Sequence, residues 1–259
     1  DTLNPTFDDR RPLASGTRSD DYTAASVGLG YRDGAWSLTN RAEFRHADTD
    51  DKISLLSGFQ HRLDNVNTIA GRLFYFDRDF AGGEEEWEGQ LDFSLVHRPL
   101  HGDWFVLNRT QLIMDALSDS NGDLRGRRLV NNTAANFKPS ERQQLALNYG
   151  ARYVMDTVDS ERYTGYTDLI GVEYRYNLTR HWDVGARGSV MHGWRTNTMD
   201  VSSGVMVGFS PIRDVWMSLG YNFKGFYDAD FTGAESRVGG IVFDFRIKFD
   251  QDTFRRNGD

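Results

Sequence analysis

Charged side chains recur at every second position along several stretches of the chain. Arg41, Glu43 and Arg45 show the spacing early in the sequence, and it returns at Asp244 and Arg246. Guanidinium groups bind carboxylate and phosphate groups in a planar, bidentate geometry. Two interpretations follow: a surface that binds or passes anions, or a ladder of ion pairs between neighbouring strands. The charged residues predicted to share this surface are Arg32, Arg41, Glu43, Arg45, Arg62, Asp92, Arg109, Arg152, Glu173, Arg175, Asp183, Arg187, Asp244, Arg246 and Lys248.

Nucleophilic catalysis is suggested by one pair of residues. His192 and Ser203 both stand at positions of the apolar face on two neighbouring segments, which are joined by 196–199. A serine nucleophile needs a base within hydrogen-bond reach and a third group that orients the base. No residue near this pair stands out as that third group. A lipid hydrolase is therefore the least favoured of three interpretations of this sequence. We expect a protein that is not an enzyme and has no catalytic residues.

Acidic residues cluster at Asp48–Asp51, Glu84–Glu86 and Asp228–Glu235. Such clusters could hold divalent cations that bridge to phosphate groups of a partner, or they could simply be solvated loops. The histidines are scattered singly, without metal-ligand spacing, and cysteine is absent. No glycine-rich phosphate-binding motif lies between a strand and a helix. The sequence therefore predicts no cofactor and no built-in metal site.

The elements that position these residues follow from a two-residue period. Between Val215 and Phe223, apolar residues alternate with small or polar ones, which is typical of a strand and would be blurred by the period of a helix. Segments 67–77 and 126–137 alternate poorly. The predicted strands are 22–32, 36–46, 52–62, 67–77, 87–97, 104–115, 126–137, 143–156, 166–177, 182–195, 200–210, 215–226 and 238–249.

The connections are predicted to alternate in length. Tight turns such as Asp33-Gly34 occupy one end of the strands. Longer acidic or glycine-rich segments occupy the other end, at 77–86, 117–125, 157–165, 196–199 and 228–237. Short turns opposite longer loops are typical of bacterial outer-membrane β-barrels.

In a barrel of this kind the apolar parity faces lipid, the charged parity faces the lumen, and aromatic residues form two belts at the membrane interfaces. The predicted lipid-facing residues are Leu147, Tyr149, Val184, Val207, Leu219, Tyr221, Phe243, Phe245 and Ile247. The predicted aromatic belts contain Trp36, Trp87, Trp104, Trp182, Trp194 and Phe249.

The composition agrees with many strands joined by turns: 13% of the 259 residues are aromatic and 26 are glycine. No run approaches the ~18 apolar residues that a membrane-spanning helix requires. The net charge of −8 argues against nucleic acid as a partner. We predict a polar segment or linker at 1–21, a barrel at 22–249 and a periplasmic tail at 250–259. About 14 strands are expected, with residues 1–10 supplying the first, and 12 is the alternative.

The C-terminal part carries a more specific resemblance. Leu219 to Phe223, Gly225 to Phe231 and Phe245 to Asp252 are similar to the C-terminal end of barrels that close large, repeat-rich surface proteins of Gram-negative bacteria. The resemblance covers only the last ~35 residues, and strand patterning supports the rest. It implies a barrel that anchors further domains, upstream of Asp1 in the same polypeptide, in the outer membrane.

The sequence therefore predicts an all-β, antiparallel, up-and-down transmembrane barrel in the outer membrane of a Gram-negative bacterium. We expect it to contact outer-membrane lipid and lipopolysaccharide and to act as the membrane anchor of a larger surface protein. The first alternative is a monomeric, porin-like channel that passes small anionic solutes through an arginine-lined lumen.

Overall fold

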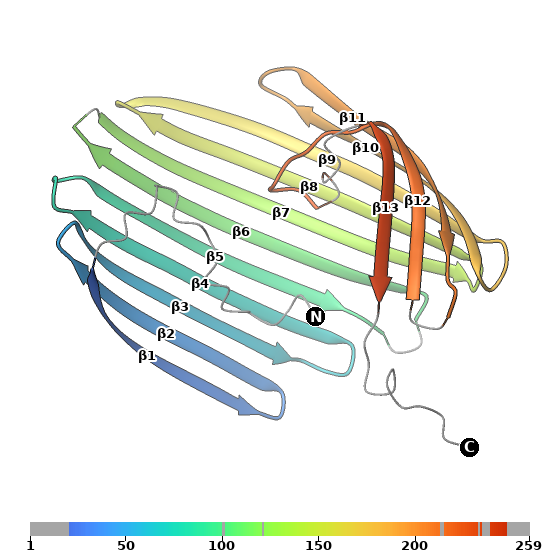
Figure 1. Cartoon of the computed structure of the whole chain (residues 1–259), viewed down its shortest axis with the longest axis horizontal. Coiled ribbons are helices and arrows are strands. Elements are labelled where there is room, and N and C mark those ends of the chain that lie inside the picture. The colour runs from blue at the N-terminus through green and yellow to red at the C-terminus, as the bar shows by residue number, and fades with distance from the viewer. Residues whose placement is uncertain are drawn as a thin grey trace. The chain divides into compact units, whose positions relative to one another are not determined.

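The computed structural model describes residues 21–99, 102–120, 122–212, 215–232, 234 and 239–247. This part of the chain consists of strands and their connections, and it contains no helix that could span a membrane. The strands, in chain order, are β1 (Tyr22–Asp33), β2 (Trp36–Ala47), β3 (Asp50–Arg62), β4 (Asn67–Phe80), β5 (Glu85–His97), β6 (Trp104–Asp119), β7 (Gly122–Ser140), β8 (Gln143–Val158), β9 (Glu161–Asn177), β10 (Trp182–Gly193), β11 (Thr198–Phe209), β12 (Val215–Lys224) and β13 (Gly240–Ile247) (Figure 1).

The strands form one sheet whose order is the order of the sequence, from β1 to β13. This arrangement confirms the predicted all-β, antiparallel, up-and-down fold. The described residues contain 13 strands, between the two predicted numbers. The predicted first strand in residues 1–10 and the tail at 250–259 lie outside the described residues.

The chain divides into two compact units, and each is treated separately below. The first unit comprises Asp1–Leu100, Leu107–Asn131 and Arg152–Gly165. The second unit comprises His101–Val106, Asn132–Ala151 and Tyr166–Asp259.

In both units the strand registers place charged and apolar side chains on opposite faces, because directly paired residues of antiparallel strands share a face. In the first unit Arg45 pairs with Lys52 and Lys52 with Arg78. In the second unit Val207 pairs with Leu219 and Leu219 with Phe243. We call these the charged face and the apolar face. On the apolar face large hydrophobic side chains are exposed, including Val27, Leu29, Ile53, Leu91, Phe93, Val207, Leu219, Tyr221, Phe243 and Phe245.

The predicted difference in loop length is largely wrong. Segments 117–125 and 157–165, expected as long loops, are mostly strand, because β6 continues to Asp119, β7 begins at Gly122, β8 continues to Val158 and β9 begins at Glu161. The β8–β9 turn is only Asp159-Ser160, with φ values of 48° and 73°. Two positive φ values are the requirement of the tightest hairpin turns. Backbone pairing between β6 and β7 and between β8 and β9 therefore extends beyond the residues that alternate clearly between apolar and polar in the sequence.

Aspartate organises the turn between β3 and β4. Asp64 Oδ1 accepts hydrogen bonds from the backbone N–H groups of Val66 and Asn67, both at 2.6 Å, and Asp64 Oδ2 accepts one from the Asn67 amide at 2.7 Å. The Asn67 side chain and these backbone donors hold the pKa of the exposed Asp64 carboxyl below its usual value. The turn between β3 and β4 is thus stabilised by an aspartate that remains ionised.

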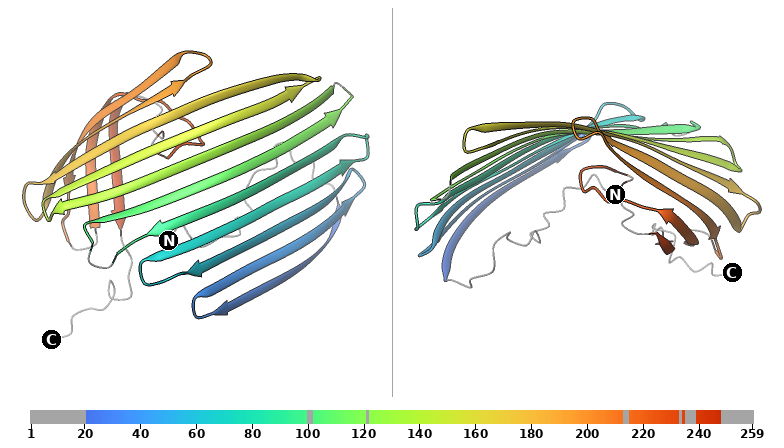
Figure 2. Two further views of the ribbon diagram at one scale, coloured as in Figure 1. Left: turned by 180° about the vertical axis from the view of Figure 1, so that it is seen from behind. Right: turned by 90° about the horizontal axis from the view of Figure 1, so that it is seen from above.

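The longest connection, between β12 and β13, does not project away from the strands. Phe231 and Ala234 of this connection are buried against Leu169 of β9, with Met191 and Phe226 packed around them. Figure 2 shows the connection lying on one side of the strands of the second unit. These residues form the hydrophobic core of that unit.

Candidate functional site

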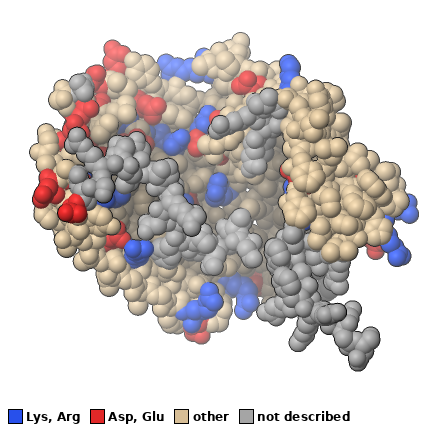
Figure 3. Space-filling view, in the orientation of Figure 1, with Lys and Arg blue, Asp and Glu red and all other residues tan. Residues whose placement is uncertain are grey.

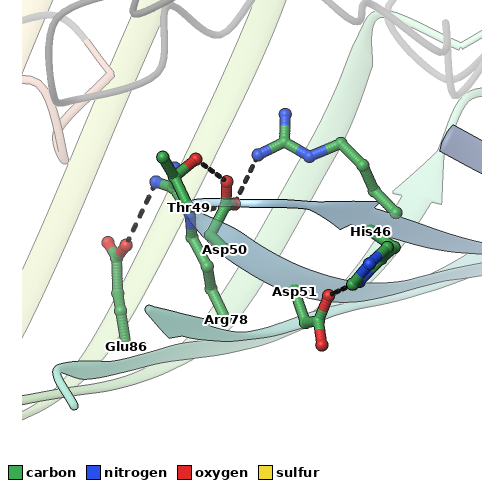
Figure 4. Close-up of polar contacts among 7 residues, drawn as sticks. His46, Thr49, Asp50, Asp51, Arg78 and Glu86 are labelled. Atoms are coloured by element: carbon green, nitrogen blue, oxygen red, sulfur yellow. Dashed lines mark hydrogen bonds and ion pairs between the residues drawn. The ribbon is translucent and has the colours of Figure 1, made fainter. Parts of the chain in front are cut away.

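The charged face of the first unit contains a network near the β2–β3 connection (Figure 4). The buried Asp50 carboxylate accepts hydrogen bonds from Arg45 Nη2 at 2.5 Å and from Arg78 Nε at 2.7 Å. Arg78 also lies 3.9 Å from Glu86 Oε2, and Thr49 donates to Asp50 Oδ1 at 3.2 Å. Asp50 is therefore neutralised by two guanidinium groups from neighbouring strands.

Aromatic rings lie beside the cations of this network. The Arg78 Cζ is 4.3 Å from the centroid of the Phe80 ring, and the Lys52 Nζ is 4.7 Å from that of Phe76. Alternate residues of a strand share a face, which brings Phe76, Arg78 and Phe80 together. Cation–π contacts of this kind hold the charged groups against the sheet.

A second network surrounds Asp92, whose side chain is 9% exposed. Its carboxylate accepts hydrogen bonds from Arg72 Nε at 2.6 Å, from Gln90 Nε2 at 2.9 Å and from Gln111 Nε2 at 2.8 Å. Buried carboxylates are tolerated when both oxygens are satisfied in this way. The network stabilises the sheet and leaves the Arg72 charge compensated.

In the second unit the charged face carries an arginine–tryptophan cluster. Arg175 is bonded to Glu173 at 2.5 Å and lies 3.9 Å from Asp183. Trp216 Nε1 donates to Asp183 Oδ2 at 2.7 Å. The Cζ atoms of Arg175 and Arg246 lie 4.3 Å and 5.1 Å from the centroid of the Trp216 ring. Trp216 thus sits between two guanidinium groups and an aspartate.

Arg187 differs from the arginines above because its partner is neutral. Its Nη2 donates to the amide oxygen of Asn222 at 2.9 Å, and among the described residues it forms no ion pair. Gly204 lies between Arg187 and Asn222 in the register. A Cβ at Gly204 would approach Asn222 Oδ1 to 2.5 Å, so the contact needs glycine there. Glu173 lies opposite Arg187 on β9 but is bonded to Arg175, so the direct partner of Arg187 is an amide and not a carboxylate.

The β12–β13 connection is held on the charged face of the second unit by specific contacts. Asn132 donates to the carbonyl of Asp230 at 2.7 Å and accepts from the backbone N–H of Thr232 at 3.0 Å, and so pairs with the segment as a strand would. A Cβ at Gly150 would lie 2.4 Å from the Phe231 ring. Asp230, Phe231, Thr232 and Ala234 therefore lie over β7, β8 and β9. The sequence pattern predicted that 228–237 is a long loop at the end of the strands. That prediction is wrong for the described residues of this segment, because they fold back over the charged face.

The predicted charged residues in the described part share the charged face. The registers place Arg32, Arg41, Glu43, Arg45, Arg62 and Asp92 together in the first unit, and Glu173, Arg175, Asp183, Arg187, Asp244 and Arg246 together in the second. Arg109 and Arg152 have the parities of Gln111 and Gly150, whose contacts lie on this face. Lys248 lies outside the described residues. That this face lines a lumen stays a prediction.

The predicted lipid-facing residues share the apolar face, and their contact with lipid likewise stays a prediction. Val184, Val207, Leu219, Tyr221, Phe243 and Phe245 are placed there by register, and Leu147 and Tyr149 are exposed and alternate with Gly150. The backbone of Ile247 pairs with Val215. Trp36, Trp104, Trp182 and Trp194 are exposed at or beside strand ends, Trp87 contacts Tyr75 with ring centroids 6.5 Å apart, and Phe249 lies outside the described residues.

One group of polar residues lies on the apolar face and was missed. Asn131 of β7 donates to Thr110 of β6 at 2.8 Å and exchanges hydrogen bonds of 3.2 Å and 3.4 Å with Asn108. Segment 126–137, which lies in β7, alternates poorly in sequence, and this is the signal of the exception. The sequence analysis also did not identify Trp216, Gln90 and Gln111 as members of the charged face. They alternate in phase with charged residues of their strands, but they carry no charge themselves.

The suggested catalytic pair is separated by the register. His192 pairs with Met199, whereas Ser203 pairs with Gly188, four residues further along β10. Four residues of strand correspond to about 13 Å, beyond hydrogen-bond reach. Asp168 lies opposite His192 on β9, and the imidazole packs against Trp194 with ring centroids 4.6 Å apart. The arrangement therefore does not bring a nucleophile to the histidine.

Acidic side chains gather where the strands of the first unit connect at one end. Figure 3 shows them along the left edge, where β2 joins β3 and β4 joins β5. His46 Nδ1 contacts Asp51 Oδ1 at 2.5 Å in this region. Among the described residues no three His, Asp or Glu side chains are arranged as metal ligands. Divalent cations at these connections stay a prediction.

No protein-family model and no curated protein sequence matches the chain. Its fold is similar to that of the siderophore receptor PirA from Pseudomonas aeruginosa, with a TM-score of 0.65 and 8% identity over 78% of this chain and 41% of that chain. It is also similar to the outer membrane channel DcaP of Acinetobacter baumannii, with a TM-score of 0.51 and 9% identity over 88% of this chain and 85% of that chain. The chain thus spans about two fifths of the receptor's length. The fold is that of Gram-negative outer-membrane β-barrels.

Proposed function

We propose that the chain is an integral outer-membrane β-barrel whose charged face lines a path for small anionic solutes. The likeness to outer-membrane barrels supports the location, and the exposed apolar face fits a hydrocarbon environment. A polar barrel interior can hold a water-filled channel. The proposal includes no catalytic step.

The observation that carries the anionic preference is the neutral partner of Arg187. Arg45, Arg78 and Arg72 are neutralised by buried carboxylates and can contribute little net field. Arg187 instead donates to an amide, and Glu173, which lies opposite it on β9, is bonded to Arg175. A cation without a direct ion pair attracts small anions by Coulomb interaction, which salt weakens.

The test is planar-bilayer conductance of the refolded protein. We expect steady channels that favour anions over cations, and we expect Arg187→Glu to remove or reverse that preference. The matched control is Arg127→Gln, which also lowers the positive charge but has the apolar parity of β7. Channels whose ion preference is unchanged by Arg187→Glu would contradict the proposed path.

The anchor role predicted from the C-terminal resemblance is a second proposal. Its support is that ion pairs and residues 226–234 occupy much of the charged face. A barrel filled in this way would be silent in the bilayer yet still migrate differently on gels before and after heating. Silence of a correctly folded protein would therefore favour the anchor over the channel.

A further inference from the structure

The second unit contains a cavity of about 910 Å³ at the end of the strands where β7 joins β8, β9 joins β10 and β11 joins β12. Its lining is rich in cationic side chains from separate elements: Lys138 of β7, Arg142 and Arg180 of two turns, Arg175 of β9 and Arg246 of β13. Among the described residues of the lining, Glu141 and Asp183 are acidic. This described part of the lining therefore has a net positive charge.

The acidic side chain deepest in this cavity is already engaged. Asp183 accepts the Trp216 hydrogen bond and lies near Arg175, and Gly208 makes room for its carboxylate, because a Cβ there would lie 2.3 Å from Asp183 Oδ2. Arg175 in turn is bonded to Glu173. Arg246 has only the Trp216 ring as its described partner. Among the described residues, the guanidinium of Arg246 thus packs on the Trp216 ring and forms no ion pair.

The turn that closes the cavity is also fixed. His181 Nδ1 contacts the Ser210 carbonyl at 2.8 Å, and Asn177 donates to the Glu141 carbonyl at 2.9 Å. Thr179 Oγ1 accepts from the backbone N–H groups of His181 and Trp182 at 3.2 Å and 3.1 Å. These bonds fix the turns from which Arg142 and Arg180 extend, and both side chains line the cavity.

We infer that this cavity binds a small oxyanion, through phosphate or carboxylate oxygens held by Arg246, Arg142 and Arg180. Guanidinium groups match the planar geometry of these oxygens, and several cations in one cavity favour an oxyanion with two negative charges over chloride. The inference deepens the proposed function by giving the anion path a binding site. It rests on that function only for the ligand's route, because binding can be measured without conduction.

The experiment is a calorimetric titration of the full chain, refolded in non-ionic detergent, with inorganic phosphate at low ionic strength. We expect phosphate to bind and chloride at the same concentration not to compete. Arg246→Gln and the double substitution Arg142→Gln/Arg180→Gln should each weaken binding by about tenfold, the loss expected for a charge-assisted hydrogen bond. Added salt should weaken binding further.

The matched control is Arg98→Gln, an exposed arginine in the β5–β6 connection of the first unit, which should leave phosphate affinity unchanged. Arg142 and Arg180 lie in turns and are exposed, so the double variant should fold even if Arg246→Gln does not. Absence of phosphate binding, or equal affinity in the double variant and the Arg98→Gln control, would overturn the inference.

A second arm separates free phosphate from the phosphate of a lipid headgroup. The titration is repeated in nanodiscs of phosphatidylcholine with and without phosphatidylglycerol. Loss of phosphate binding only when phosphatidylglycerol is present would support the site with a lipid as its occupant. Equal binding in both would support a free solute. A barrel that shows no conductance in the bilayer yet binds phosphate would refute the proposed channel but would support the proposed binding site.

Discussion

At the scale of single residues, the charged face contains two kinds of arginine. Arg45, Arg72 and Arg78 are neutralised by carboxylates that are themselves buried, so these arginines stabilise the sheet. Arg187 and Arg246 have neutral or aromatic partners. The difference follows from the side-chain contacts and not from the register alone, because Glu173 lies opposite Arg187 and yet is bonded to Arg175. It separates structural cations from those available to a ligand.

The Asp92 network gives a stability prediction at this scale. Asp92→Asn removes the charge that Arg72 compensates, and one donor of the new amide would point toward the donors of Gln90 or Gln111. Because Arg72 is partly exposed to water, we expect a loss of about 2 kcal/mol, less than for a fully buried pair. The measurement is the urea midpoint of unfolding in detergent.

Glu43→Gln is the control for that prediction. Glu43 pairs with Arg41 at 2.7 Å, and both side chains are more than one third exposed. Pairs of this kind contribute at most ~1 kcal/mol. Equal midpoints for Asp92→Asn and Glu43→Gln would show that burial of the Asp92 network does not matter.

At the scale of elements, the β12–β13 connection is the feature with the largest consequence for the charged face. It is held by Asn132 through two backbone hydrogen bonds and by Phe231 packed over Gly150. These two contacts come from β7 and β8, far from the connection in sequence. The connection therefore covers part of the charged face of the second unit.

Gly150→Val is expected to displace this connection, because a Cβ alone would approach the Phe231 ring to 2.4 Å. The native chain has no cysteine, so Ala234→Cys, at a position only 1% exposed, introduces a single reporter. We expect slow maleimide labelling of Ala234→Cys and at least severalfold faster labelling when Gly150→Val is added.

The control for the displaced connection is Gly30→Ala in the same reporter background. Gly30 lies in β1, and no atom lies within 4 Å of a Cβ built there. Labelling should remain slow in this variant. If Gly150→Val also left labelling slow, Phe231 would not be held over Gly150.

At the scale of the whole molecule, the assignment of the two faces determines every functional proposal. A membrane barrel presents its apolar face to lipid, whereas a water-soluble sheet would have to cover it. Adjacent residues of β1 test this directly. Val27 is 71% exposed on the apolar face, and Ser26 pairs with Glu43 on the charged face.

Val27→Arg should impair folding into lipid vesicles, since an arginine on the lipid face costs about 2–4 kcal/mol near the bilayer midplane. Ser26→Arg, the neighbouring control, should fold as the parent does. The measurement is the fraction of heat-modifiable protein after refolding into vesicles. If Val27→Arg inserted normally and Ser26→Arg failed, the charged face and not the apolar face would contact lipid. The proposed channel would then lose its basis.

The sequence was sufficient to locate the strands and to sort their residues between two faces. Both depend on a two-residue period, which is local, so Leu219 and Asn222 could be assigned without knowing what lies beside them. Loop lengths were predicted poorly because pairing continues through polar residues such as those at the β6–β7 and β8–β9 turns, where no apolar alternation marks the strand.

Only the tertiary structure decided which charges are cancelled and where the β12–β13 connection lies. Whether Arg187 meets a carboxylate or an amide depends on the register of three strands and the space left by Gly204. Whether Phe231 points outward or lies over Gly150 depends on residues that the sequence separates by about 80 positions and that the fold brings together. The sequence by itself determined the alternation of the faces, because that property belongs to each strand alone; contacts between distant segments determined what the charged face can bind.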